Sequence, residues 1–131
     1  MSDQPVAPTG EAYLRTIAMP ADATPSGDIF GGWLLSQMDL AGGVIANEQA
    51  GGRVATVAIE AMKFHKPVMI GDEVSCYCRV ARLGTTSVTI AVESWVRRAA
   101  GRHREKVTEG LFTYVALDLQ RKPRPICPAP I

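Results

Sequence analysis

The chain lacks the features that mark several large classes of protein. Its 14 Lys and Arg nearly balance its 13 Asp and Glu, which gives a formal net charge of +1. Such a balance provides no broad basic surface, so we expect no nucleic-acid partner. No apolar run approaches the roughly 20 residues that a membrane-spanning helix needs. We therefore expect no association with a membrane.

Cysteine and histidine are also scarce. There are three cysteines, Cys76, Cys78 and Cys127, and two histidines. Cys76 and Cys78 lie two residues apart, so on a strand they point to one face and cannot easily form a disulfide. No Cys and His set has the spacing of a zinc site, so we predict no metal site. The N-terminus has neither a basic start nor an apolar run, so we expect no signal peptide and a cytoplasmic protein with reduced thiols.

What the sequence does have is enough apolar material for one core. The chain has 131 residues, of which 47% are hydrophobic, and this predicts a single domain. We place the domain at residues 10–120, between a Pro- and Gly-rich segment at 1–9 and a Pro-rich tail at 121–131. Hydrophobic periodicity and turn residues predict a helix at 30–50 and strands at 12–19, 54–64, 73–83, 87–98 and 106–119.

The order of these elements predicts the fold class. The last strands are joined by short connections, so they should be antiparallel neighbours. One helix cannot cover both faces of a large sheet, so we predict an α+β fold in which a curved antiparallel sheet wraps around one central helix. The helix has few polar residues and should be buried nearly all round. The remaining sheet surface and edges then need a second subunit, which predicts a homo-oligomer.

Asp39 is the most informative residue, because it lies inside an otherwise apolar helix. A carboxylate in such a place is costly unless it is paired, hydrogen-bonded or used in chemistry. Gly31 and Gly32 begin the same helix and leave its first N–H groups uncovered, which suits carbonyl chemistry. The alternative is a structural ion pair of Asp39 with a partner such as Arg53 or Lys63 across a subunit contact.

Two further glycine motifs are predicted to be structural. Gly42 and Gly43 lie inside the helix, where each glycine costs about 1 kcal/mol relative to alanine, and close packing of helix on sheet is the preferred reason. Gly84-Thr-Thr-Ser87 is typical of a hairpin turn. Cys76 is not expected to act as a nucleophile, because no His or Asn is arranged near it in the sequence.

One motif resembles that of a known family. Gly27-Asp-Ile-Phe-Gly-Gly-Trp-Leu-Leu-Ser-Gln-Met-Asp-Leu-Ala-Gly-Gly43 is similar to the helix motif of the hotdog-fold acyl-CoA thioesterases, in particular the small bacterial YciA-type enzymes. The resemblance continues through Lys66-Pro67 and Gly71-Asp72. It covers roughly residues 10 to 120, and further matching segments are 53–64, 83–88, 92–95 and 112–116.

This resemblance implies a hotdog fold and the hydrolysis of acyl-CoA to a free fatty acid and CoA, without a metal or redox cofactor. It implies active sites at subunit interfaces in dimers that assemble further into a tetramer or hexamer. Asp39 would be the catalytic carboxylate, as general base or nucleophile, and Gly31 and Gly32 would polarise the thioester carbonyl through backbone N–H. The predicted substrate-binding residues are Thr24, Ser26, Val57, Ala58, Lys66, Arg82, Gly84, Thr85, Thr86 and Ser87.

The chain departs from the family at one position. Relatives usually carry Asn where Thr24 stands, and a hydroxyl offers fewer fixed hydrogen bonds than an amide. A second hypothesis therefore remains, a hotdog module that binds acyl-CoA without turnover. A dehydratase acting on acyl-carrier protein is disfavoured, because that chemistry usually uses a His and the helix motif has none.

Overall fold

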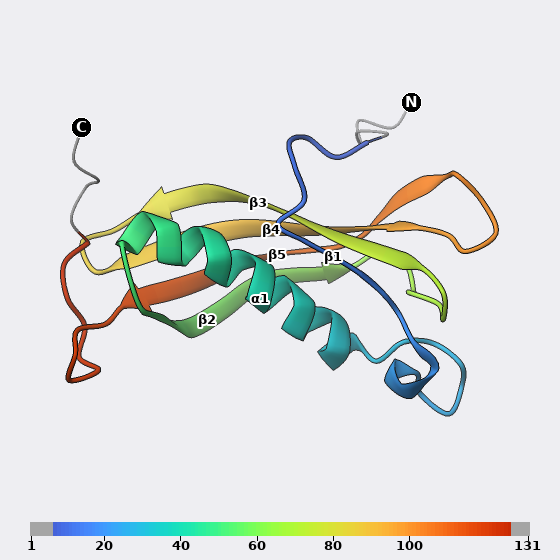
Figure 1. Cartoon of the computed structure of the whole chain (residues 1–131), viewed down its shortest axis with the longest axis horizontal. Coiled ribbons are helices and arrows are strands. Elements are labelled where there is room, and N and C mark those ends of the chain that lie inside the picture. The colour runs from blue at the N-terminus through green and yellow to red at the C-terminus, as the bar shows by residue number, and fades with distance from the viewer. Residues whose placement is uncertain (1–6, 127–131) are drawn as a thin grey trace.

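The computed structural model describes residues 7–126 and consists of one helix lying across a five-stranded sheet (Figure 1). The sheet is antiparallel throughout and has the strand order β1-β3-β4-β5-β2. The predicted α+β architecture is thus confirmed. The elements are β1 (Leu14–Ile17), a 3-10 helix (Pro20–Asp22), α1 (Gly31–Ala50), β2 (Val54–Phe64), β3 (Glu73–Leu83), β4 (Ser87–Arg97) and β5 (Arg104–Ala116).

β2 and β3 have the predicted limits, and β4 ends one residue early, at Arg97. The first and last strands are shorter than predicted, although β5 begins two residues early, at Arg104. β1 spans Leu14–Ile17 rather than 12–19. Its pairing still extends beyond these limits, because Tyr13 N–H donates to Cys76 O at 2.9 Å and Ala18 N–H donates to Asp72 O at 3.0 Å. Pro20 then begins a 3-10 turn that ends the pairing.

β5 ends at Ala116 and not at residue 119 as predicted. The Asp118 carboxylate accepts hydrogen bonds from the Gln120 and Lys122 N–H groups, at 2.8 and 2.9 Å. An aspartate that binds the backbone two residues on stabilises a turn at the expense of a strand. Leu119 is consequently 94% exposed.

The core lies between α1 and the middle of the sheet. Val88, Ile90 and Val92 alternate along β4 and are almost fully buried. From the helix, Met38 and Ala41 meet them and are fully buried. This inward set follows the period-2 alternation on which the strand was predicted.

The prediction that α1 is buried nearly all round is wrong for a single protomer. Only one side of the helix packs on the sheet, and the opposite side leaves Leu40 61% and Val44 45% exposed. β2 forms one edge of the sheet, and its residue Val57 is 58% exposed. Because apolar side chains on a sheet edge and a helix face are normally covered, these surfaces fit a chain that associates with further copies.

Gly42 shows why this helix contains glycine. An ideal Cβ at this position would lie 3.2 Å from Tyr114 Cζ and closer still to the Tyr114 hydroxyl. The predicted close packing of helix on sheet is therefore confirmed. At Gly43 the nearest contact is an ordinary 3.9 Å to Tyr114 Cε1, so the tight restriction concerns Gly42.

The terminal segments lie only partly within the described residues. The described part of the tail is attached to the domain, because Arg124 Nη2 donates to Ala50 O at 2.8 Å and Ile126 N–H donates to Thr85 O at 2.8 Å. Cys127, predicted to be a reduced thiol, falls outside these residues. Within residues 7–126, no helix has the length and apolar character needed to cross a membrane.

Candidate active site

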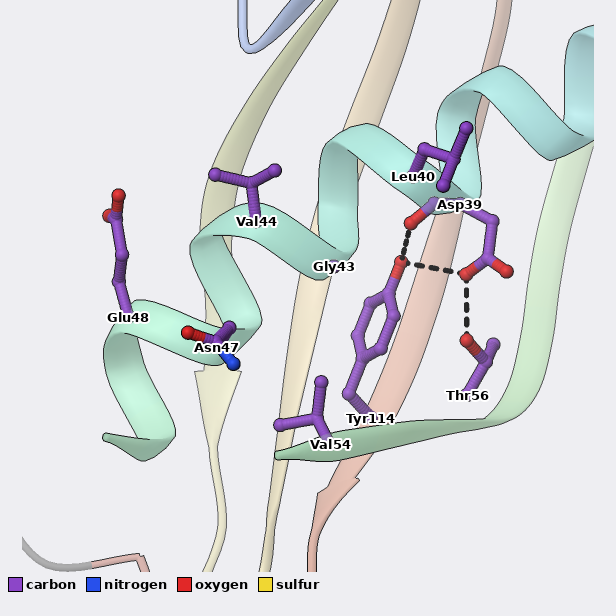
Figure 2. Close-up of a pocket in the computed structure, with 9 residues that line it drawn as sticks. All are labelled: Asp39, Leu40, Gly43, Val44, Asn47, Glu48, Val54, Thr56 and Tyr114. Atoms are coloured by element: carbon purple, nitrogen blue, oxygen red, sulfur yellow. Dashed lines mark hydrogen bonds between the residues drawn. The ribbon is translucent and has the colours of Figure 1, made fainter. Parts of the chain in front are cut away.

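The Asp39 carboxylate lies between the middle of α1 and strands β2 and β5, where two hydroxyl groups bind it (Figure 2). Thr56 Oγ1 donates to Asp39 Oδ1 at 2.7 Å. The Tyr114 hydroxyl lies 3.0 Å from the same Oδ1 and 2.9 Å from the main-chain oxygen of Asp39. Among the described residues of one protomer nothing donates to Oδ2, and Asp39 forms no ion pair there, so a pair with Arg53 or Lys63 across a subunit contact stays a hypothesis.

Asp39 faces an open cleft of about 510 Å³ between α1 and the start of β2. Beyond the carboxylate the cleft is apolar, and its outer end is polar (Figure 2). The apolar lining comes from Leu40, Val44 and Val54, and the polar end from Asn47 and Glu48. A carboxylate at the inner end of an apolar cleft can address the polar end of a molecule whose remainder is apolar.

Tyr114 is held as a neutral phenol. Burial raises the pKa of its hydroxyl above the ordinary value, and the neighbouring Asp39 charge raises it further. A neutral hydroxyl keeps its proton and can donate it to the carboxylate. Tyr114 therefore acts as a hydrogen-bond donor to Asp39 over the whole pH range in which enzymes work.

The start of α1 offers a second polar feature. Phe30 precedes the helix and provides no side-chain cap. Within the described residues, the N–H groups of Gly31 and Gly32 donate no hydrogen bond, although such groups normally find a partner. A Cβ on Gly32 would meet nothing within 4 Å, so packing inside the protomer does not require this glycine.

Asp39 and the bare helix start do not meet within one protomer. Gly31 lines a separate cleft of about 290 Å³, together with Phe64 and Lys66. Asp39 follows Gly32 by seven residues, which corresponds to about 10 Å along a helix. One carbonyl group cannot lie within hydrogen-bond distance of both.

The predicted substrate-binding residues are likewise spread over the protomer. Thr24 Oγ1 accepts a hydrogen bond from Ser26 N–H at 3.2 Å, which forms a local turn before the helix. Lys66 lines the cleft at the helix start, where its Nζ donates to Glu105 Oε1 at 2.7 Å. Val57 and Ala58 lie on the edge strand β2.

The Gly84–Ser87 turn joins β3 to β4, and Gly84 N–H donates to Ser87 O at 2.7 Å, as expected for a hairpin. It lies at the end of the sheet beside the C-terminus of α1, whereas Gly31 and Gly32 begin the helix at the other end (Figure 1). Arg82 precedes this turn on β3 and is exposed, and Thr85 and Thr86 form its tip. In a single protomer the turn is therefore remote from the helix start.

Carboxylates bind part of the cluster of basic residues at 97–106. Arg98 pairs with Asp72 at 2.6 Å and with Glu105 at 2.9 Å. Lys106 Nζ lies 2.9 Å from Glu109. Arg98 and Lys106 are thus held in ion pairs with carboxylates of the protein, which makes them less available to a ligand.

Cys76 is a poor nucleophile, as predicted, and so is Cys78. Burial raises the pKa of the Cys76 thiol to about 11 and that of Cys78 to about 12. Because the thiolate is the reactive form, neither reacts readily near neutral pH. Within residues 7–126, no group of three His, Cys, Asp or Glu side chains gathers as a metal site would require.

Thr56 and Tyr114 were not predicted from the sequence as residues of the site. Thr56 is the third residue of β2, shortly after the turn that follows α1, so its proximity to the helix follows from the topology but not from any motif. The Gly42-Gly43 pair did indicate that something packs closely on this part of the helix. Nothing in the sequence identified Tyr114 as that group.

Comparison with known proteins assigns the chain to a family. The family model of the Thioesterase superfamily matches residues 26–99. The acyl-CoA thioester hydrolase YciA of Salmonella typhimurium is 54% identical over 91% of this chain and 92% of its own length. The YciA of Escherichia coli K12 is 54% identical over 89% of this chain and 91% of its own length.

Solved structures of thioesterases are similar to this chain over most of its length. A hexameric thioesterase from Yersinia pestis superposes with a TM-score of 0.88 at 52% identity and covers 92% of this chain and 98% of its own. A hexameric hotdog fold thioesterase of Campylobacter jejuni superposes with a TM-score of 0.85 at 42% identity and covers 90% of this chain and 91% of its own. The chain has the hotdog fold and belongs to the thioesterase superfamily, among relatives of the YciA type.

Proposed function

We propose that the protein hydrolyses acyl-CoA thioesters to a free fatty acid and CoA, with Asp39 as the catalytic carboxylate. The observation that carries the proposal is the state of this carboxylate. Its Oδ1 is bound by Thr56 and Tyr114, Oδ2 accepts no hydrogen bond from the described residues, and the residue lines an open cleft. The printed names of the relatives, acyl-CoA thioester hydrolases, support the same activity.

The helix start supplies the second half of the proposed site. The N–H groups of Gly31 and Gly32 lie at the positive end of the helix dipole and donate to no other described residue. A thioester oxygen placed there would accept one of these hydrogen bonds, and the bond would strengthen as negative charge develops on that oxygen. Gly32 is the better candidate, because the space beside it is open.

Two copies of the chain are needed to complete this site. Asp39 and Gly32 of one protomer lie about 10 Å apart along the helix, so they cannot act on one carbonyl. In the proposed assembly, Asp39 of one copy faces the helix start of another. The exposed Leu40 and Val44 beside Asp39, and the exposed edge strand β2, provide apolar surface for this association.

Asp39 has two chemical routes. As general base it removes a proton from water, whose oxygen attacks the carbonyl carbon; as nucleophile its oxygen attacks first and water cleaves the resulting anhydride. In both routes the C–S bond breaks, the CoA thiolate leaves and takes up a proton, and the acyl group leaves as a carboxylate. A thiolate is a good leaving group, so neither route needs a metal or redox cofactor.

Binding of the CoA moiety is proposed to involve residues outside the cleft. Arg82 is exposed, and the Gly84–Ser87 turn beside it offers N–H and hydroxyl groups that suit phosphate or pantetheine oxygens. Lys66, in the cleft beside the helix start, is a further candidate. Thr24 and Ser26 precede the helix, and Val57 and Ala58 lie on the edge strand, where they would contact substrate only in the assembly.

Thiol release from a series of acyl-CoAs tests the proposal. The protein should liberate CoA catalytically from at least one chain length, measured with a thiol reagent against a blank that contains protein without substrate. Stoichiometric binding of every acyl-CoA without thiol release would instead support the alternative, a hotdog module that binds acyl-CoA without turnover. Thr24 in place of the usual Asn is the feature that keeps this alternative open.

A further inference from the structure

Tyr114 has an unusual relation to Asp39, because its hydroxyl contacts two oxygens of the same residue. The phenolic oxygen lies 2.9 Å from the main-chain oxygen and 3.0 Å from Oδ1 of Asp39. Tyr114 is only 2% exposed, so its ring has little freedom to move away. Contacts to both the backbone and the carboxylate fix the orientation of the Asp39 side chain relative to its helix.

The helix is shaped to allow this contact. The Tyr114 ring packs against the helix at Gly42, in a notch left by the missing side chain. A Cβ atom at this position would lie 3.2 Å from Tyr114 Cζ and 3.3 Å from Tyr114 Cε2. Glycine inside a helix costs about 1 kcal/mol relative to alanine, so the notch lowers helix stability. Its effect is to let a β5 hydroxyl reach the helix backbone one turn before Gly42.

The two hydroxyl donors act on the same carboxylate oxygen. Thr56 Oγ1 lies 2.7 Å from Asp39 Oδ1, and Tyr114 donates to that oxygen from another strand. Figure 2 shows Asp39 Oδ2 turned away from both hydroxyl groups. Oδ1 is thereby occupied by hydrogen bonds within the protomer, and Oδ2 is left free of them.

We propose that Tyr114, seated in the notch at Gly42, is a positioning residue that holds the Asp39 carboxylate with only Oδ2 directed to the reacting atoms. The inference rests on the proposed catalytic role of Asp39. Tyr114 touches Asp39 and not the substrate, so it acts through that carboxylate. The raised pKa of the Tyr114 hydroxyl agrees with this role, because the phenol stays protonated and remains a donor.

The test compares Tyr114→Phe with Tyr77→Phe by steady-state thiol release. Tyr77 is also buried, at 6% exposed, but lies on β3 and is no neighbour of Asp39. Tyr114→Phe should lower kcat by roughly tenfold to hundredfold, the range for one hydrogen bond to a charged group, and leave KM unchanged. Tyr77→Phe should leave both constants unchanged.

Gly42→Ala provides an independent variant. Its methyl group would displace the Tyr114 hydroxyl, so it should lower kcat in the parent protein. In a Tyr114→Phe background the hydroxyl is already absent, so Gly42→Ala should have a clearly smaller further effect on kcat. If the two substitutions have fully additive effects on kcat, Gly42 does not act through its contact with the Tyr114 hydroxyl. If Gly42→Ala does not fold, Tyr114→Phe decides alone.

Three results would overturn the inference: a parental kcat in folded Tyr114→Phe, a loss confined to KM, or failure of Tyr114→Phe to fold. Circular dichroism and size-exclusion chromatography establish the folded state. Asp39→Asn is assayed in parallel to separate the two proposals. If Asp39→Asn is active, the proposed catalytic role of Asp39 fails; if Asp39→Asn is inactive and Tyr114→Phe is normal, only the positioning role fails.

Discussion

A side chain at Gly42 would collide with Tyr114: an ideal Cβ there lies 3.2 Å from the Tyr114 ring carbon Cζ and closer still to the hydroxyl. The neighbouring Gly43 has no such conflict, since its Cβ would lie 3.9 Å from Cε1. Two adjacent glycines in one helix thus have different reasons to be present. Gly42→Ala and Gly43→Ala make the same chemical change, so the free energies of unfolding of the two variants can be compared directly.

Gly43→Ala should stabilise the fold and Gly42→Ala should not. Alanine is favoured over glycine in a helix by about 1 kcal/mol, so Gly43→Ala should gain up to that amount. Gly42→Ala should lose about 1–3 kcal/mol through overpacking, which exceeds the helical gain. Urea unfolding midpoints of the two variants measure the difference. Equal stabilisation by both substitutions would refute the close contact at Gly42.

Gly32→Ala tests whether glycine at this position is needed for packing within the protomer or for the close approach of a substrate to the helix start. A methyl group on Gly32 would meet nothing within 4 Å in the protomer, so the variant should fold and be at least as stable as the parent. It should still lose at least about tenfold in kcat/KM, because a methyl group displaces a carbonyl held at the neighbouring N–H. Thiol release and thermal melting are measured on the same sample. Unchanged kinetics would remove the helix start from the proposed site.

The network around Glu105 should make stability sensitive to acid. Lys66 and then Arg98 donate to this carboxylate and lower its pKa from 4.5 to about 2. A lowered folded-state pKa gives stability that is fully present above about pH 4.5 and is lost as the pH falls towards 2.

Glu105→Gln should therefore show a shallower loss of stability across this pH interval, followed by urea unfolding at successive pH values. Partial solvent exposure reduces the size of the effect, because water screens the charges. Glu11→Gln, an exposed carboxylate outside this network, serves as the control and should follow the parent. Parallel curves for Glu105→Gln and the parent would show that the network adds nothing to stability.

Thr24 is where the chain departs from its relatives. Its hydroxyl accepts a hydrogen bond from Ser26 N–H at 3.2 Å, and an Asn side chain can accept the same bond. Thr24→Asn should therefore fold and raise kcat by roughly tenfold at most, the scale of one oriented hydrogen bond, with little change in KM.

Thr24→Val, which keeps the shape and removes the acceptor, is the matched variant for steady-state kinetics, and Ser26→Ala tests the other hydroxyl of the loop. If all three variants match the parent in kcat and KM, this loop takes no part in the chemistry.

The fold was largely predictable because strong periodic signals determine it. Alternation in β4 follows from a local rule, and so does the end of α1 at Gly51, a glycine in the left-handed region with φ 70°; the structure has these elements where expected. The end of β5 was misplaced because one side chain, Asp118, binds the backbone and turns the chain. Such a side-chain preference is hard to weigh against an apolar residue such as Leu119.

The candidate site was only half predictable. Asp39 was conspicuous because a carboxylate in an apolar helix needs a reason. Its partners were not, because Thr56 and Tyr114 come from strands whose register against the helix depends on the whole sheet. The helix motif suggested an aspartate close to Gly31 and Gly32, and the family resemblance implied a site shared between subunits. The length of the helix separates the two features within one protomer, so the proposed site combines two copies of the chain.

The activity of Asp39→Asn tests the central claim most directly. The amide keeps the size of the side chain and can still accept hydrogen bonds from Thr56 and Tyr114, so the fold and acyl-CoA binding should persist. Asp118→Asn, in the turn after β5, is the matched control and should retain parental turnover. The account predicts that kcat of Asp39→Asn falls at least about 100-fold, the usual scale for loss of a general base. Turnover close to that of the parent in folded Asp39→Asn would contradict it.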